Sequence, residues 1–220
     1  WGAGPVPVPA IPNGPAAGGE LIMMLTEETP VPQAALPVEE MKDHLRMGSG
    51  FADDGLQDGL IETYLRAAMA AIEGRIGKML FQRRFLWVLE CWREDEQALP
   101  VSPVSTVVSV TQVDAAGGEV MVPVGAYRLI KDLHRPRLAG KGISLPAIPS
   151  EGAVKVVFDA GFGAAWTDIP VDLRQAVLLL AGEYYEHRHD DGAEAAGLPF
   201  GVVTLIERWR TVRILGGGKK

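Results

Sequence analysis

The chain has 220 residues, with 21 lysine or arginine residues against 28 aspartate or glutamate residues, which gives a formal net charge of −7. This acidic balance disfavours a general duplex-binding surface, because such surfaces are basic. The single cysteine, Cys91, excludes an internal disulfide framework and fits a reducing compartment, and no apolar run approaches the roughly 20 residues that span a bilayer.

The N-terminal stretch is predicted to be an extended arm. Residues 1–20 are rich in proline, glycine and alanine and carry almost no charge, so they cannot form the interior of a helix. We therefore expect an arm over residues 1–22. Pro37 then suits the first turn of a short helix over residues 38–46, with its apolar side chains on one side.

A long amphipathic helix is predicted over residues 53–78. Apolar side chains recur there at the three- and four-residue spacing of one helical face. They are Leu60, Ile61, Tyr64, Leu65, Ala68, Met69, Ile72 and Ile76. Asp58, Glu62, Arg66 and Glu73 fall between them, so we expect these four side chains to face solvent or a partner.

The ends of this helix carry stop signals. Asp53 or Asp54 can accept a hydrogen bond from the free N–H groups of the first turn. Gly77 can adopt the left-handed conformation that ends a helix, with Lys78 beside the negative end of the helix dipole.

The pattern changes to strands between residues 82 and 162. Aromatic and β-branched residues predict strands at 83–92, 104–113, 127–130 and 153–162. The turn at 114–119 indicates a hairpin after the second of these. Residues 134–152 are expected to form a long, base-rich irregular loop. The region therefore resembles a small antiparallel β module inserted between helices.

Helical signals return at Pro170. The helix that follows is apolar all round from Val177 to Ala181, so it should be buried on every side by its own core or by a neighbouring subunit. A last helix is predicted over roughly residues 200–209. From Glu207 to the end there are five basic residues and one acid, a local charge of +5 − 1 = +4, which suggests an acidic partner site.

Several stretches resemble chemical motifs without satisfying them. Residues 74–78 contain Gly and Lys, but the interval is too short for a phosphate loop and no Ser or Thr follows. Residues 161–166 end in Trp where a dinucleotide fingerprint needs a small residue.

Candidate metal and nucleophile residues are no stronger. Glu183, Glu186 and His187 lack the Glu-x-x-His interval of a di-iron site, so a solvated helix end is the better interpretation. Cys91 is interpreted as a buried structural thiol in an apolar strand. The sequence predicts no enzyme, no catalytic residues, no cofactor and no metal.

The order of segments along the whole chain resembles the head–tail connector (adaptor) family of long-tailed bacteriophages and phage-like particles such as gene transfer agents. The resemblance covers about residues 25–215, and it does not include the arm. The segments that carry it are 37–46, Asp53-Asp54 with Leu56 and Leu60, Ala67-Ala68, Ile72-Glu73, 77–80, Leu99-Pro100, Pro103-Val104, 107–110, 127–129, 158–163, Ile169-Pro170, 173–176, 184–188 and 198–202.

The resemblance implies an α+β fold, a small α-helical bundle with an inserted antiparallel β module and a C-terminal tail, and the composition of residues 1–22 adds the extended N-terminal arm. The corresponding division is 1–22 for the arm, 23–81 with 163–209 for the helical core domain, 82–162 for the β module and 210–220 for the tail. It also implies that the C-terminal segment docks on the portal protein, and the candidate portal-binding residues here are Trp209, Arg210, Arg213, Ile214 and Leu215.

The partners implied are the portal protein, a stopper or tail terminator protein, double-stranded DNA that passes through without specific binding, and the chain itself as a ring, usually of twelve copies. The place implied is the neck of a virion or phage-like particle, assembled in the bacterial cytoplasm. The resemblance leaves open whether the particle is a phage or a gene transfer agent. Two alternatives also stay open: another neck or tail-completion protein of the stopper type, and an enzyme with an unrecognised site.

Overall fold

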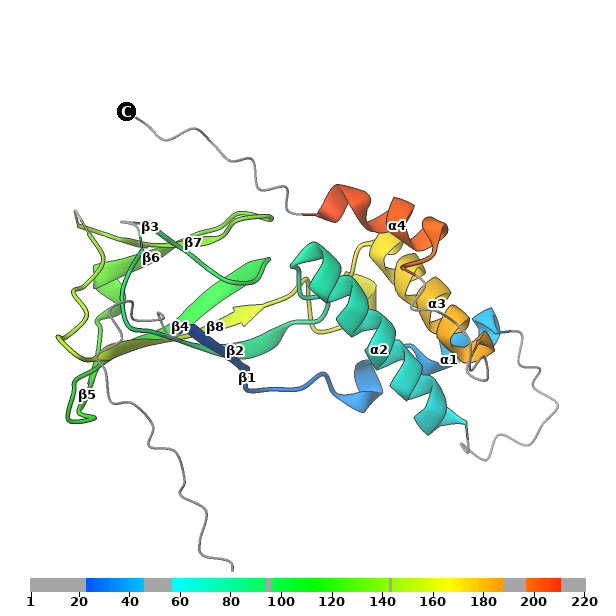
Figure 1. Ribbon diagram of the computed structural model, residues 1–220, viewed down its shortest axis with the longest axis horizontal. Helices are drawn as coiled ribbons and strands as arrows, with labels where there is room; N and C mark the ends of the chain where they lie inside the picture. Colours follow the sequence, from blue (N-terminus) through cyan, green and yellow to red (C-terminus); the bar gives the residue numbers. More distant parts are fainter. Residues whose placement is uncertain (1–22, 46–56, 94–95, 143, 188–196, 211–220) are drawn as a thin grey trace, which may run out of the picture.

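The computed structural model describes residues 23–45, 57–93, 96–142, 144–187 and 197–210. The described part is elongated, with the helices gathered at one end and the strands at the other (Figure 1). Helices and antiparallel sheets together give the expected α+β fold.

In the described part of the chain, four α-helices form the first end: α1 (Val38–His44), α2 (Asp58–Ile76), α3 (Val171–Glu186) and α4 (Phe200–Ile206). Short 3-10 turns η1 (Gln33–Ala35), η3 (Trp166–Asp168) and η4 (Glu207–Trp209) flank them. The helices share one hydrophobic core, in which Leu65, Ile72, Leu173, Val177 and Ile206 have essentially no exposed surface. Burial of this apolar surface is the main source of stability for the bundle.

Helix α2 differs from its prediction at its beginning and on one face. It begins at Asp58, and the proposed caps Asp53 and Asp54 lie outside the described residues. Gly77 ends it with a φ of 67°, as predicted. The spacing predicts Leu60 on the apolar face, but this residue of the first turn is 40% exposed.

Helix α3 is buried less evenly than its all-round apolar sequence predicts. Val177, Leu180 and Ala181 are buried among the other helices, whereas Leu178 and Leu179 are only partly covered within the single chain. The remaining apolar surface of these two leucines is therefore open to contact with another molecule.

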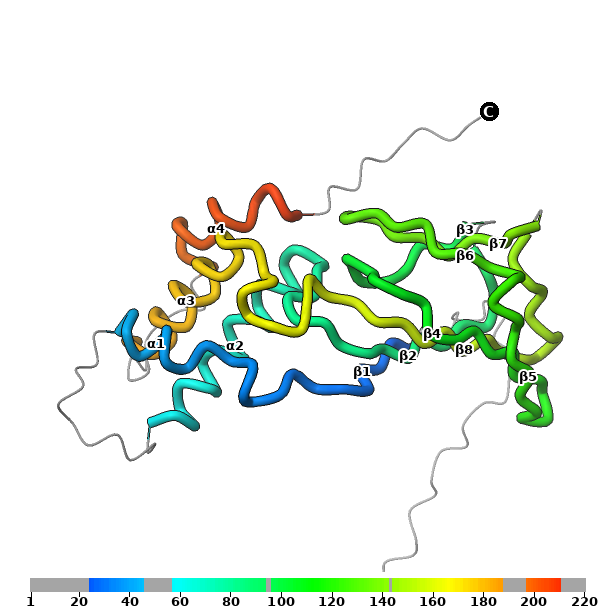
Figure 2. Tube along the Cα trace, turned by 180° about the vertical axis from the view of Figure 1, so that it is seen from behind, coloured from blue at the N-terminus to red at the C-terminus, as the bar shows by residue number. Residues whose placement is uncertain are grey.

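Eight strands among the described residues form the second end, in two sheets. The five-stranded sheet has the order β1-β2-β8-β4-β5 and the three-stranded sheet the order β3-β7-β6, with antiparallel pairing throughout. The strands are β1 (Met23–Glu27), β2 (Arg83–Leu89), β3 (Glu96–Ala98), β4 (Val104–Val113), β5 (Glu119–Met121), β6 (Tyr127–Ile130), β7 (Arg137–Gly140) and β8 (Ala153–Ala160), with the 3-10 turn η2 (Val124–Ala126) before β6. The two sheets lie one over the other (Figure 2) and enclose a second hydrophobic core that includes Trp87, Leu138, Val156 and Phe158.

Three strands lie where the sequence pattern predicts something else. Strand β1 falls within residues 23–81, which the sequence predicts to be part of the helical domain, yet it pairs with β2 along its whole length. Strand β7 interrupts the loop predicted at 134–152, and β3 was not predicted. All three are short, and three to five residues are too few for an alternating pattern to be recognised.

The sequence pattern predicts a buried thiol in a strand at Cys91, and this prediction is wrong. Strand β2 ends at Leu89, so Cys91 lies in the bend that follows and is half-buried.

The chain passes back from the sheets to the helices through a close backbone contact at Gly161. This glycine has a φ of 135°, and a Cβ atom there would lie 2.2 Å from the carbonyl oxygen of Phe81. The N–H of Phe162 donates to the carbonyl of Leu80 at 3.1 Å, and that of Gln82 donates to Gly163 at 2.7 Å. Gly161 and Gly163 therefore serve the close backbone packing between the helical end and the strand end of the molecule.

Candidate assembly surface

The start of the predicted portal-binding segment is fixed to the helical core through Trp209. Its side chain is 7% exposed and meets the ring of Phe162 edge-to-face, with centroids 5.4 Å apart. The indole Nε1–H donates a hydrogen bond of 2.7 Å to Oδ2 of Asp172, in the first turn of α3. The residue thus lies in the core of the bundle, with its polar group satisfied.

Two arginines flank this tryptophan on the surface. The guanidinium of Arg208 lies 4.8 Å from the centre of the Trp209 ring, and its Nε is 2.8 Å from Oδ2 of Asp172. Arg210 is exposed and forms hydrogen bonds of 2.9 and 3.1 Å with the Glu207 carboxylate. Among the candidate portal-binding residues, the structure therefore places Trp209 in the core and Arg210 on the surface. Arg213, Ile214 and Leu215 lie outside the described residues.

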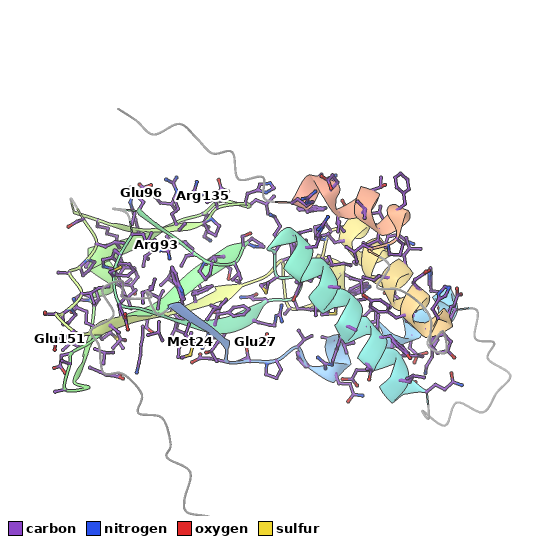
Figure 3. The ribbon with its side chains drawn as sticks, viewed as in Figure 1. Met24, Glu27, Arg93, Glu96, Arg135 and Glu151 are labelled. Carbon is purple, nitrogen blue, oxygen red and sulfur yellow. The ribbon has the colours of Figure 1, made fainter. Side chains whose placement is uncertain are left out.

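A buried ion pair joins α2 to the five-stranded sheet. Oε2 of Glu73 lies 2.6 Å from an Nη atom of Arg83, and Oε1 of Glu73 accepts a 2.7 Å hydrogen bond from the N–H of Leu80. Arg83 also contacts Glu27 of β1 at 2.8 Å. Figure 3 places Glu27 on the β1 side of the boundary between strands and helices.

The sequence pattern predicts Glu73 on the polar face of α2, but it is 7% exposed. Burial raises the pKa of the Glu73 carboxyl above its ordinary value, while the Arg83 guanidinium and the Leu80 N–H act in the opposite direction. Glu73 has the sequence spacing of a solvent-exposed residue, yet it links α2 to strand β2. Its burial could have been predicted only if Arg83 had been known to be its partner.

A second polar contact at the same boundary involves Lys78. Its side chain is fully buried, and its Nζ lies 3.1 Å from Nδ1 of His134, in the loop between β6 and β7. Burial lowers the pKa of the Lys78 ammonium, and the nearby Asp132 carboxylate partly offsets this. Both sheets are thus tied to the C-terminal end of α2 through charged or polar side chains.

Both edges of the five-stranded sheet carry exposed apolar side chains. Met24 and Leu25 of β1 are 54% and 37% exposed, and Val120 and Met121 of β5 are 64% and 69% exposed. Met24, labelled in Figure 3, belongs to β1, which is the first strand in the order of the sheet. Single exposed apolar residues are common, but on an edge strand they lie beside backbone groups that can pair with another strand, which suits a contact surface. Sequence periodicity did not identify these edges as candidate sites.

Within the described ranges, no group of three or more histidine, cysteine, aspartate or glutamate side chains could hold a metal ion. His187 lies 3.5 Å from Glu183 one helical turn away, at the solvated end of α3. None of the helices described has the length and apolar character needed to cross a membrane.

Solved structures of closely similar chains give the context for this surface. A chain in the neck of an empty gene transfer agent (GTA) particle, computed with C6 symmetry, is 56% identical with a TM-score of 0.81. A chain in the virion of a native GTA particle is 57% identical with a TM-score of 0.78, and one in the neck of a native GTA particle, computed with C12 symmetry, is 53% identical with a TM-score of 0.76. Each similarity covers 88% of this chain and 98% of the solved chain. No protein-family profile and no curated protein matches the chain.

The chain is more than half identical to these solved chains over nearly their whole length. This similarity identifies it as a structural component of a phage-like particle. The chain belongs to the family of neck proteins of gene transfer agent particles.

Proposed function

We propose that the chain is the head–tail connector, or adaptor, subunit of such a neck. Copies of it assemble into a ring, with twelve the expected number, that joins the portal to the next neck or tail protein. The observation that carries the proposal is the 53–57% identity to chains from GTA particles, two of them from necks computed with C6 or C12 symmetry. A closed ring of identical chains needs a head-to-tail contact that is repeated by rotation.

The charge of the chain supports a channel role. With a net charge of −7, a ring of these subunits repels phosphate, so double-stranded DNA can pass without being held. A basic lining would bind several phosphates at once and retain the DNA. The subunit is therefore proposed to guide DNA without binding it specifically.

The portal contact is proposed to involve the segment that follows Trp209. Because Trp209 is held in the core, the chain leaves the bundle at Arg210, which has an extended backbone. The residues beyond it include Arg213, Ile214 and Leu215, and arginine and apolar side chains of this kind suit an interface. Anchoring the root of a docking segment reduces the conformational entropy lost on binding.

A truncation tests the portal contact. We expect a chain ending at Arg210 to fold, because it keeps Trp209 and the helical core, but to fail to attach to portal-bearing heads. The assay is co-sedimentation with DNA-filled heads, followed by imaging for joined tails. The matched control is the full-length Arg208→Ala variant, which changes an exposed ion pair and should still attach. Normal attachment and tail joining by the truncated chain would exclude the C-terminal segment as the portal anchor and make residues 1–22 the next candidate.

A further inference from the structure

The five-stranded sheet ends in two edges that are open in the described part of the chain. Strand β1 forms one edge and strand β5 the other. Unpaired N–H and C=O groups on an edge can pair with a strand of another chain, and many proteins block this with lysine or proline. The β1 sequence, MMLTE, contains neither residue.

The two edges are linked by a single row of residues that crosses the sheet. The pairing register places one residue of each strand in this row, in the order Met24, Val88, Lys155, Thr111 and Met121. The row begins and ends with a methionine that is more than half exposed. Both edges therefore present an exposed methionine at the same level of the sheet.

The two edge strands also run in the same direction. Each neighbouring pair in the order β1-β2-β8-β4-β5 is antiparallel, so the direction reverses four times between β1 and β5. Rotation about an axis parallel to the strands keeps their direction. A copy related by such a rotation would present its β1 edge, in parallel orientation, to the β5 edge of the first.

We propose that β5 of one subunit pairs in parallel with β1 of the next, with Met121 beside Met24, and that this contact sets the register between neighbours in the ring. The inference rests on the proposed ring function. A second copy suits both edges at once, because one head-to-tail contact repeated around a ring covers β1 and β5 on every subunit. A two-fold contact of β1 with β1 would leave β5 open.

The contact is short, and this limits its role. Strand β5 has three residues, and Met121 lies at its end. A ladder of this length offers few backbone hydrogen bonds, while the four exposed apolar side chains of the two edges become buried. We infer that the ladder fixes direction and register, and that partly covered residues elsewhere, such as Leu178 and Leu179, add area to the interface.

Disulfide trapping tests the contact. Met24→Cys and Met121→Cys are introduced together into a Cys91→Ser background, and the protein is oxidised alone and with its portal protein. The two positions are separated by four strand spacings, about 19 Å, so the Cα atoms within one chain are too far apart for a disulfide. Any disulfide between them must therefore join two subunits.

The expected result is a ladder of covalent oligomers for the double variant. An equal mixture of the two single variants should give covalent dimers that extend no further, because each chain then carries one reactive edge. Each single variant alone should remain monomeric on a non-reducing gel. The matched control combines Met24→Cys with Phe200→Cys, a residue of α4 that is 86% exposed, and should give no ladder.

The contrary results are distinct. Absence of the ladder overturns the proposed contact, and dimers formed by Met24→Cys alone overturn it in favour of a two-fold contact. The mass of the reduced samples separates this inference from the proposed function. If rings assemble but the disulfide does not form, only the edge contact is overturned. If no rings form in either sample, with or without the portal protein, the proposed ring is contradicted as well.

Discussion

The hydrogen bond of 2.7 Å from the indole of Trp209 to the carboxylate of Asp172 ties the end of the described chain to the first turn of α3. The ring of Phe162, which follows strand β8 in the chain, packs against the same indole. Trp209 therefore joins three segments of the fold. The portal contact is therefore proposed only for the residues that follow Trp209.

Replacement of Trp209 by alanine should destabilise the whole subunit. Loss of a buried aromatic side chain leaves a cavity and typically costs about 3–5 kcal/mol of unfolding free energy. The measurement is chemical denaturation followed by circular dichroism. Arg210→Ala, next to it on the surface, is the control and should change stability by less than about 0.5 kcal/mol. Equal stabilities of the two variants would contradict a core position for Trp209.

Ile72→Asp tests the long helix α2. Ile72 is fully buried in the helical core, so an aspartate there is an unpaired charge and should cost several kcal/mol. The control is Ala70→Asp, at an exposed position two residues earlier on the same helix. We expect the Ala70 variant to stay folded and the Ile72 variant to lose helicity or solubility. A soluble, fully helical Ile72→Asp protein would show that the residue is not buried.

The buried Glu73 predicts a particular pH dependence. Its folded-state pKa is raised above the ordinary value of 4.5, mainly by burial. As the pH rises past that value, the unfolded chain loses this proton more readily than the folded chain. The contribution of Glu73 to stability is therefore fully present at low pH and is lost as the pH rises through the folded-state pKa.

Glu73→Gln removes this titration while keeping an oxygen that can accept from the Leu80 N–H. Melting temperatures of both proteins from about pH 4 to about pH 7 should show the wild type losing stability relative to the variant as the pH rises. A relative gain by the wild type over that range would show that the Arg83 ion pair outweighs burial.

The separate hydrophobic cores predict that the helices can fold without the sheets. Phe81 and Gly163 form a β-bridge, so the two points at which the chain passes between the helices and the sheets lie side by side. A short Gly/Ser linker can therefore replace residues 83–160. Residues 23–28 should also be removed, because β1 loses its partner, and Glu73→Gln avoids leaving a buried charge without Arg83. We expect the shortened chain to retain its helicity and to melt in one transition. Loss of cooperative unfolding would argue against a separable β module.

The parts of the fold that follow from local pattern were predictable from sequence. The spacing from Ile61 to Ile76 indicates α2, and Gly77 indicates where it ends. Strands β4, β6 and β8 follow from their β-branched and aromatic residues, and the turn after Val113 indicates the β4–β5 hairpin.

The features that were not predicted depend on residues far apart in sequence. Strand β1 is recognisable only through its pairing with β2, and Arg83 lies 56 residues after Glu27. Glu73 has the spacing of a solvated residue, and its burial depends on Arg83. The edge relationship between Met24 and Met121 needs the order of the whole sheet, which no local period encodes.

The proposed function requires the chain to form a ring that binds a portal protein. The most direct test is the mass of the purified 23.6 kDa protein, alone and mixed with its portal protein. We predict a closed oligomer, with twelve copies expected, bound to the portal in the mixture. A protein that remains a monomer in both samples, with no portal complex, would contradict the claim.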